Sequence, residues 1–128
     1  MDPAPYVQPS DIGFGDKWDK IHLTDSVFYV GPEETQLETT VLNYKFCMLK
    51  YIECEGTRYP ISRESLYLAM GCEAHTIESP YLNAAIDGQK ITMIVKENNS
   101  GKKIDLYLHF QAGPITNLIE IHQSAKSL

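Results

Sequence analysis

The amino-acid sequence predicts a mainly β fold: an antiparallel β-barrel or sandwich of about seven strands with one C-terminal α-helix. Three observations lead to this fold class. Short runs rich in Val, Ile, Tyr and Phe lie between turn residues, apolar and polar residues alternate over 90–110, and apolar residues have helical spacing after Gly113. The 128 residues suit a single domain, expected over residues 15–128.

Residues 1–14 contain few aliphatic side chains and three prolines, Pro3, Pro5 and Pro9. Proline favours extended polyproline-type backbone, and chain ends without apolar anchors are often disordered. We therefore expect an extended or disordered tail before the domain. A short linear binding motif around Pro3-Ala4-Pro5-Tyr6 is the alternative interpretation.

Short strand-like segments fill the first half of the domain. Residues 27–30 (VFYV) form one strand that ends at the breaker Gly31-Pro32. Residues 39–53 are rich in Val, Tyr, Phe and Ile and predict one long bent strand or two shorter ones. Further strands are expected at residues 58–61, 66–70 and 81–86.

Residues 90–110 predict a β-hairpin. Apolar residues alternate along 90–95, and a second alternating run covers 104–110, with Ile104, Leu106, Leu108 and Phe110 on one side. The intervening residues 97–102 (ENNSGK) are rich in Asn and Gly, which tolerate the positive φ angles of a hairpin turn.

The chain is then expected to end in a helix over about residues 114–126. Gly113 breaks the preceding strand, and Pro114 suits the first turn of a helix. Ile115, Leu118, Ile119 and His122 fall at positions i, i+3, i+4 and i+7, which places them on one helical face.

This layout resembles pleckstrin-homology-type domains, in which seven antiparallel strands are capped by a C-terminal amphipathic helix. The hairpin at 90–110 and the helix at 114–126 carry the resemblance, which is one of element order alone. The tryptophan usual in that family's helix is missing, because the chain's single tryptophan is Trp18. The resemblance implies a binding domain for a phosphoinositide or a peptide.

Three glutamates, Glu33, Glu34 and Glu38, cluster in the segment 31–38, where a lipid-binding relative would carry basic residues. Carboxylates repel phosphate, so this segment favours protein partners over inositol lipids. The three glutamates are candidate contacts for a Lys- or Arg-rich peptide. Simple solvation of a loop is the alternative interpretation.

Tyrosine is over-represented, with eight Tyr against four Phe and one Trp. Tyrosine combines a large ring with a polar tip and is enriched at protein interfaces. Tyr107 and His109 share the outward face of their predicted strand with Asp105, and both are candidate partner contacts. Tyr44 could join or oppose them. Coverage of this face by the helix or a second sheet is the alternative.

The three cysteines and four histidines predict neither a metal site nor a catalytic site. Cys72 and His75 have zinc-like spacing, but Cys47 and Cys54 are seven residues apart and would face opposite sides of a regular strand. The histidines are scattered over different elements, and no known catalytic motif is present. We expect structural thiols, no cofactor and no enzyme activity.

The net charge of −6 and the scattered lysines argue against binding to nucleic acid or to an anionic membrane surface. An odd number of cysteines is awkward in an oxidising compartment, and the N-terminal residues lack the pattern of a signal peptide. The expected location is therefore intracellular, either cytoplasmic or nuclear.

Together these features predict a non-enzymatic intracellular interaction module that binds a protein or peptide partner, with a basic partner as one possibility. Homodimerisation through an exposed strand edge or the tyrosine face is plausible. Two alternatives stay open: an acidic, oligomeric β-sandwich chaperone of basic proteins such as histones, and a small enzyme or ligand-binding barrel.

Overall fold

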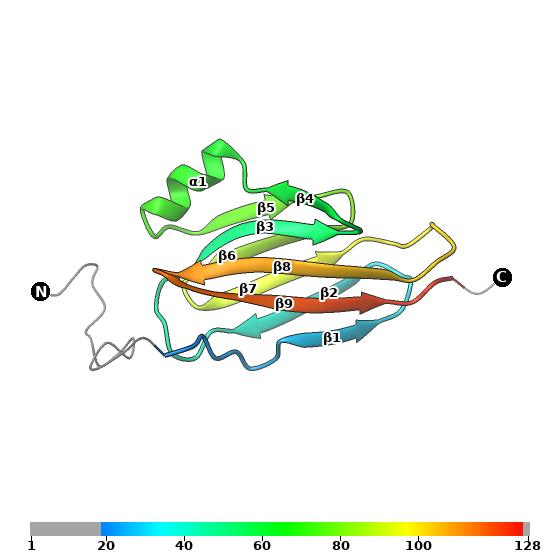
Figure 1. The fold of residues 1–128 in the computed structure, drawn as a ribbon, viewed down its shortest axis with the longest axis horizontal. Helices are drawn as coiled ribbons and strands as arrows, with labels where there is room; N and C mark the ends of the chain where they lie inside the picture. Colours follow the sequence, from blue (N-terminus) through cyan, green and yellow to red (C-terminus); the bar gives the residue numbers. More distant parts are fainter. Residues whose placement is uncertain (1–18, 127–128) are drawn as a thin grey trace, which may run out of the picture.

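A computed structural model describes residues 19–126, which form two open β-sheets and one short helix (Figure 1). The five-stranded sheet has the order β1 (Val27–Val30), β9 (Ile115–Gln123), β8 (Ile104–Ala112), β3 (Met48–Cys54), β4 (Thr57–Pro60). The four-stranded sheet has the order β2 (Thr35–Thr40), β7 (Lys90–Val95), β6 (Leu82–Asp87), β5 (His75–Glu78). The helix α1 (Arg63–Met70) connects β4 to β5. The predicted mainly β fold is confirmed.

All neighbouring strands are antiparallel except β1 and β9, which pair in parallel. The segment before β1 contacts the other sheet, because Leu23 forms a bridge with Val41 and the Thr24 N–H donates to the Thr40 carbonyl at 3.0 Å. The chain therefore crosses from one sheet to the other immediately before β1, and it crosses back at Gly31-Pro32.

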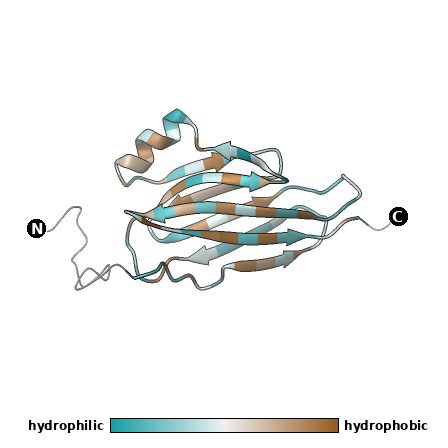
Figure 2. Cartoon of the chain, viewed as in Figure 1, coloured by the Kyte–Doolittle hydropathy of each residue, from teal (hydrophilic) through white to brown (hydrophobic). Residues whose placement is uncertain are grey.

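The hydrophobic core lies between the two sheets, and alternation along each strand supplies it. In β8 the residues 104, 106, 108 and 110 are buried while 105, 107 and 109 are not. Figure 2 shows the same alternation of hydrophobic and hydrophilic residues along β8 and β9. The largest fully buried side chains come from both sheets and the preceding segment: Ile21, Leu49, Ile52, Ile77, Leu82, Ile91, Met93, Leu106, Leu108, Phe110, Ile119 and Ile121.

The two strands predicted at 90–110 exist, but the hairpin prediction is wrong. β7 pairs with β2 and β6, whereas β8 pairs with β3 and β9 in the other sheet. Buried Asn98 anchors the crossing loop: its N–H donates to the Pro32 carbonyl at 2.7 Å, and its side-chain amide donates to the Lys102 and Ser124 carbonyls. Alternation alone could not distinguish the two pairings, because both sheets face the same core.

The predicted C-terminal helix at about 114–126 is also wrong, because residues 115–123 form strand β9. Gly113, at φ 58°, and Pro114 make a two-residue turn, and Ala112 pairs with Ile115 across it. The apolar residues at 119 and 121 point inward with strand periodicity. Isoleucine and threonine are β-branched and favour this extended conformation over a helix.

Conversely, the strand expected at 66–70 is part of helix α1. The Ser62 hydroxyl accepts a hydrogen bond from the Ser65 N–H at 3.1 Å and so caps the first turn. Strands β2 and β5 were not fully anticipated: β2 occupies much of the segment that was expected to be an acidic loop. The tail predicted at residues 1–14 lies outside the described residues.

The hairpin and the terminal helix were the two elements that carried the resemblance to pleckstrin-homology-type domains. Neither forms as that resemblance requires. We therefore base no functional argument on it.

Candidate binding face

The outward side of the five-stranded sheet carries a continuous group of aromatic and charged residues, which we call the aromatic face. The strand register places these side chains in three rows across the sheet. The rows are Tyr29–His122–Asp105, Val27–Glu120–Tyr107–Glu53–Arg58 and Leu118–His109–Tyr51–Pro60. Their position follows from the alternation that buries the intervening apolar residues in the core.

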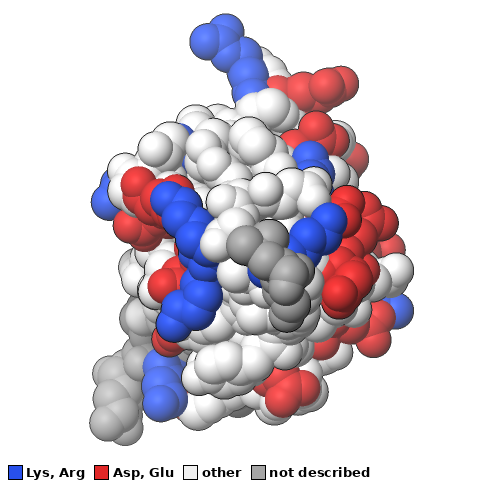
Figure 3. Space-filling view, turned by 90° about the vertical axis from the view of Figure 1, so that its right-hand side faces the viewer, with Lys and Arg blue, Asp and Glu red and all other residues white. Residues whose placement is uncertain are grey.

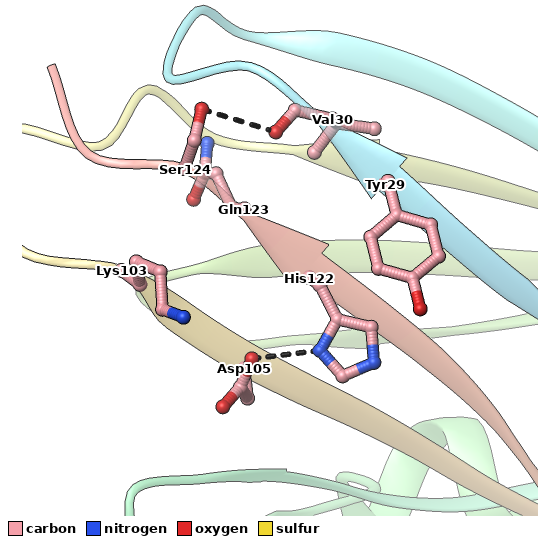
Figure 4. A pocket seen from close by; sticks show the side chains of 7 residues that line it. All are labelled: Tyr29, Val30, Lys103, Asp105, His122, Gln123 and Ser124. Atoms are coloured by element: carbon pink, nitrogen blue, oxygen red, sulfur yellow. Dashed lines mark hydrogen bonds and ion pairs between the residues drawn. The ribbon is translucent and has the colours of Figure 1, made fainter.

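One end of the aromatic face is organised around His122 (Figure 4). Its Nδ1 lies 2.7 Å from Asp105 Oδ1, and its Nε2 lies 3.3 Å from Glu120 Oε1. The Tyr29 ring stacks on the imidazole with a centroid distance of 5.1 Å. The hydrogen bond to Asp105 is the main cause that raises the pKa of His122; partial burial opposes it, and Glu120 adds to the increase. Only the protonated ring can donate to both carboxylates at once.

Beside His122 lies an open hollow of about 320 Å³, which we call hollow 1. Its lining residues come from β1, β8, β9 and the adjoining loops: Tyr29, Val30, Lys103, Asp105, His122, Gln123 and Ser124. Figure 4 shows Tyr29 and Lys103 on opposite sides of the His122–Asp105 pair. The hollow thus combines an aromatic ring with side chains that donate and accept hydrogen bonds.

The other end of the aromatic face repeats this arrangement around His109. The Tyr51 ring stacks on His109 at a centroid distance of 4.2 Å, and His109 Nε2 lies 3.0 Å from Glu53 Oε1. Arg58 lies over the Tyr51 ring, 4.7 Å from its centroid. An open hollow of about 400 Å³, hollow 2, is lined by Lys50, Tyr51, His109, Phe110, Gln111, Thr116, Asn117 and Leu118.

Tyr107 lies between the two histidine clusters. Its ring meets His122 edge-on at a centroid distance of 6.5 Å. Partial burial raises the pKa of its phenol, and the nearby carboxylates of Asp105 and Glu120 raise it further. The phenol is therefore a neutral hydrogen-bonding group at physiological pH.

The structure brings together only some of the predicted contact residues. Tyr107 and His109 lie together on the aromatic face, where part of each side chain remains accessible. Glu33 and Glu34 are exposed in the turn between β1 and β2. Glu38 lies on the outward side of the other sheet, where its carboxylate is 2.8 Å from Lys90 Nζ. The glutamates and the aromatic face are thus separate surfaces.

Tyr44 belongs to neither surface, because it is buried and its hydroxyl donates to the Asp19 carbonyl. The second sheet does not cover the aromatic face, since Tyr29 is 80% exposed.

Sequence reasoning missed most of the aromatic face. The sequence did not indicate Tyr29 or Tyr51 as partner contacts, and it placed His122 on the apolar face of the expected C-terminal helix. The alternation of residues 116, 118, 120 and 122 against buried 119 and 121 was the signal that could have placed His122 beside Asp105.

Of the residues considered as zinc ligands, Cys54 and His75 are buried and Cys47 is partly buried, whereas Cys72 is exposed, contrary to the expectation of structural thiols. Burial raises the pKa of the Cys47 thiol to about 12 and that of Cys54 to about 11, so both are protonated near neutral pH. His75 is buried; its Nε2 accepts from the Leu49 N–H at 3.0 Å, and its Nδ1 lies 2.9 Å from the Glu73 carbonyl. Within residues 19–126, no three His, Cys, Asp or Glu side chains are grouped as a metal site requires.

Basic and acidic side chains are interspersed on the end of the molecule that carries the C-terminus (Figure 3). Lys102 pairs with Glu55 at 3.3 Å, and Lys126 pairs with Glu97 at 2.7 Å. Separately, none of the helices in the described part of the chain has the length and hydropathy needed to cross a bilayer.

The fold and the face define a two-sheet β domain with one exposed aromatic side. The orders β2-β7-β6 and β9-β8-β3 resemble the B-E-D and G-F-C orders of immunoglobulin-type sandwiches, although here β5 extends the first sheet. No protein-family model and no curated protein matches the sequence.

Solved structures with a similar fold include two from Bacteroides species. One is the NMR structure of a protein from Bacteroides thetaiotaomicron, with a TM-score of 0.64, 16% identity and 88% of each chain covered. The other is a GH5 xyloglucanase from Bacteroides ovatus, solved in complex with a XXXG heptasaccharide. Its TM-score is 0.53 and its identity 11%, and the match covers 84% of this chain but only 19% of the xyloglucanase. At these identities the likeness concerns the fold alone.

Proposed function

We propose that this chain is a non-catalytic binding module that holds a protein or peptide partner on its aromatic face. The exposed, oriented ring of Tyr29 is the observation that carries the proposal: it is 80% exposed, yet His122 holds it by stacking. Large rings that are already fixed in place lose little conformational entropy when a partner covers them. Tyr51 is held in the same way by His109.

A binding role suits the face better than catalysis. Both ring nitrogens of His122 face carboxylates, so neither is free to take a proton from a substrate. The Ser124 hydroxyl in hollow 1 donates to the Val30 carbonyl at 3.4 Å, and no histidine among residues 19–126 is its hydrogen-bond partner. A catalytic nucleophile requires such an activating base.

The proposal that a basic segment binds the glutamates concerns a different place on the molecule. Glu33 and Glu34 remain exposed in the β1–β2 turn, whereas Glu38 is engaged by Lys90. A basic partner, or the acidic chaperone considered as an alternative, would use Glu33 and Glu34 without touching the aromatic face. The Glu33→Lys/Glu34→Lys variant separates the two surfaces experimentally.

An oligosaccharide is the second candidate ligand. Hollow 1 combines the Tyr29 ring with the polar side chains of Asp105, Lys103 and Ser124, a combination that suits the apolar face and hydroxyl groups of a sugar. The xyloglucanase of similar fold was solved with a heptasaccharide, which makes glucan fragments a sensible probe.

An intracellular location remains part of the proposal. Its support is that Cys47, Cys54 and Cys72 are all free thiols in the structure. Mass spectrometry after alkylation during denaturing lysis of the cells tests it: three alkylated cysteines agree with a reducing compartment, and an intermolecular disulfide through exposed Cys72 contradicts it.

Peptide and glycan arrays probed with the purified chain test the binding function. The Tyr29→Ala/Tyr51→Ala double variant is expected to lose the signals that the wild type gives. Tyr67→Ala is the matched control, because Tyr67 is 74% exposed but lies on α1. Binding that survives in the double variant, or is lost in the control, contradicts the assignment of the aromatic face.

A further inference from the structure

We propose that a second site, at one edge of the four-stranded sheet, binds an arginine side chain of a partner's peptide segment. The site is separate from the aromatic face, so the inference goes beyond the proposed function. It is an open hollow of about 260 Å³ between the start of α1 and strand β5, which we call hollow 3. Its lining residues are Pro60, three residues around the start of α1 (Ser62, Glu64 and Ser65) and residues 76–78 of β5.

Strand β5 leaves one row of its backbone groups without a strand partner, because it is the last strand of its sheet. The Ser79 N–H donates to the Leu82 carbonyl at 3.0 Å, so residues 75, 77 and 79 direct their backbone groups toward β6. The backbone N–H and C=O groups of Thr76 and Glu78 therefore point away from β6. Both residues line hollow 3, where these groups form no hydrogen bond within residues 19–126.

Ser65 supplies a further polar group without a partner. The residue is only 9% exposed; its N–H donates to the Ser62 hydroxyl, but its own hydroxyl forms no hydrogen bond within residues 19–126. In that part of the chain, Asn83 Oδ1 is the one completely buried side-chain oxygen or nitrogen without a partner, so the Ser65 hydroxyl keeps access to hollow 3. Polar groups that are buried to this degree normally have a partner, which points to a ligand at this wall.

The charge of hollow 3 is negative. Glu64 lies on the α1 side and Glu78 on the β5 side, and neither forms an ion pair within residues 19–126. No basic residue lines the hollow; Arg63, which begins α1, is not among the lining residues. The N-terminus of α1 contributes only about half a positive charge, which two full carboxylate charges outweigh. The hollow therefore favours a cation over an anion.

The arrangement of acceptors suits a guanidinium group. Carboxylates, the Ser65 hydroxyl and the backbone carbonyls of Thr76 and Glu78 come from both sides of the hollow. A guanidinium directs five N–H donors outward in one plane and stays charged at physiological pH, whereas a lysine ammonium has three donors at one point. The edge N–H groups can donate to a carbonyl next to the arginine, which makes a peptide segment a better ligand than free arginine.

The test is a calorimetric titration of the full chain with a capped heptapeptide of glycine, serine and threonine that carries one central arginine. Glu64→Gln and Glu78→Gln are each expected to weaken binding by about fivefold, and Ser65→Ala by about threefold. Replacing the arginine with citrulline, which keeps the shape and removes the charge, should weaken binding by about tenfold. Glu33→Gln is the matched control, because Glu33 is exposed in the β1–β2 turn and should leave the affinity unchanged.

Circular dichroism of each variant checks that the fold is intact. Undetectable binding of the arginine peptide, or equal affinity for the citrulline peptide, overturns the proposal. Unchanged affinity in both glutamine variants of hollow 3, or an equal loss in Glu33→Gln, overturns the location. Free arginine amide that binds as tightly as the heptapeptide overturns the assignment of a peptide segment as the ligand.

The site is distinguished from the aromatic face by a second pair of variants. Tyr29→Ala/Tyr51→Ala should leave the affinity for the arginine peptide unchanged, and a loss in this variant overturns the separate site. Arrays probed with the Glu64→Gln/Glu78→Gln chain report the aromatic face without a contribution from hollow 3. Failure at hollow 3 therefore leaves the proposed function of the aromatic face standing, and the reverse also holds.

Discussion

At the scale of single residues, the charge of His122 affects how its end of the aromatic face is arranged. A neutral imidazole has one N–H and can satisfy only one of Asp105 and Glu120, whereas the imidazolium donates to both. Protonation therefore orders three side chains on two neighbouring strands and fixes the ring on which Tyr29 stacks.

This charge predicts a pH dependence of stability. Because the folded pKa of His122 is raised, its contribution is fully present below its unfolded pKa, about 6.5, and is lost as the pH rises through the folded value. We expect His122→Gln to reduce the free energy of unfolding by less than about 1 kcal/mol, with the difference largest under acidic conditions. Urea denaturation of the wild type and of the variant at pH 5.5 and pH 8.5 measures this difference in unfolding free energy. A difference that is larger at pH 8.5 than at pH 5.5 contradicts the stabilising role of protonated His122.

His75 has a larger effect on stability because it is buried. A bulge between Leu49 and Tyr51 interrupts the β3–β8 ladder, and His75 Nε2 accepts the Leu49 N–H there. We expect His75→Leu to destabilise the fold by about 2–3 kcal/mol, since it leaves a buried N–H unpaired. Urea denaturation checks this, with Thr76→Ala, at an exposed position of the same strand, as the control. Equal stability of the two variants would falsify the role given to His75.

At the scale of secondary-structure elements, the alternation of apolar and polar residues predicted where strands form. It did not predict which strands pair with each other. The strand segments 90–95 and 104–110 were recognised because their inward residues are apolar at every second position. Their partners were missed because the buried amide of Asn98, which anchors the loop between the sheets, has no recognisable pattern in the sequence. The helix predicted at 114–126 does not form. The apolar positions 115, 119 and 121 partly fit both the helical repeat and the two-residue repeat of a strand, and the β-branched residues in this segment favour the strand.

The β8–β9 turn provides a test at this scale. Gly113 has φ 58°, which disfavours residues with a Cβ atom, whereas Gly71 at the end of α1 has φ −85°. We expect Gly113→Ala to destabilise the protein by about 1 kcal/mol and Gly71→Ala to have a smaller effect. Thermal denaturation compares them. If Gly71→Ala were less stable than Gly113→Ala, the β8–β9 turn would not have the conformation described.

At the scale of the whole molecule, the domain presents surfaces of different character. The aromatic face covers one sheet, the turn with Glu33 and Glu34 projects from the β1 end, and Glu38 lies on the opposite sheet beside Lys90. The sequence indicated Tyr107 and His109, because both lie on one alternating strand. It could not indicate Tyr29 or Tyr51, because these join the face only through the pairing of β1 with β9 and of β3 with β8.

Homodimerisation through the aromatic face remains a proposal at this scale. Light scattering across a range of concentrations tests it. A dimer that Tyr29→Ala/Tyr51→Ala converts to a monomer supports self-association through the face. A dimer that this variant leaves unchanged places the contact at a strand edge or elsewhere.

The central claim is that the aromatic face is the binding surface. The most direct test is NMR titration of the isotopically labelled full chain with its best array ligand, following backbone and tyrosine ring signals. We expect the chemical-shift changes to concentrate on the outward residues of β1, β9, β8 and β3, with Tyr29 and Tyr51 changing most. Changes concentrated on the four-stranded sheet, on α1 or on the Glu33–Glu34 turn would contradict the claim.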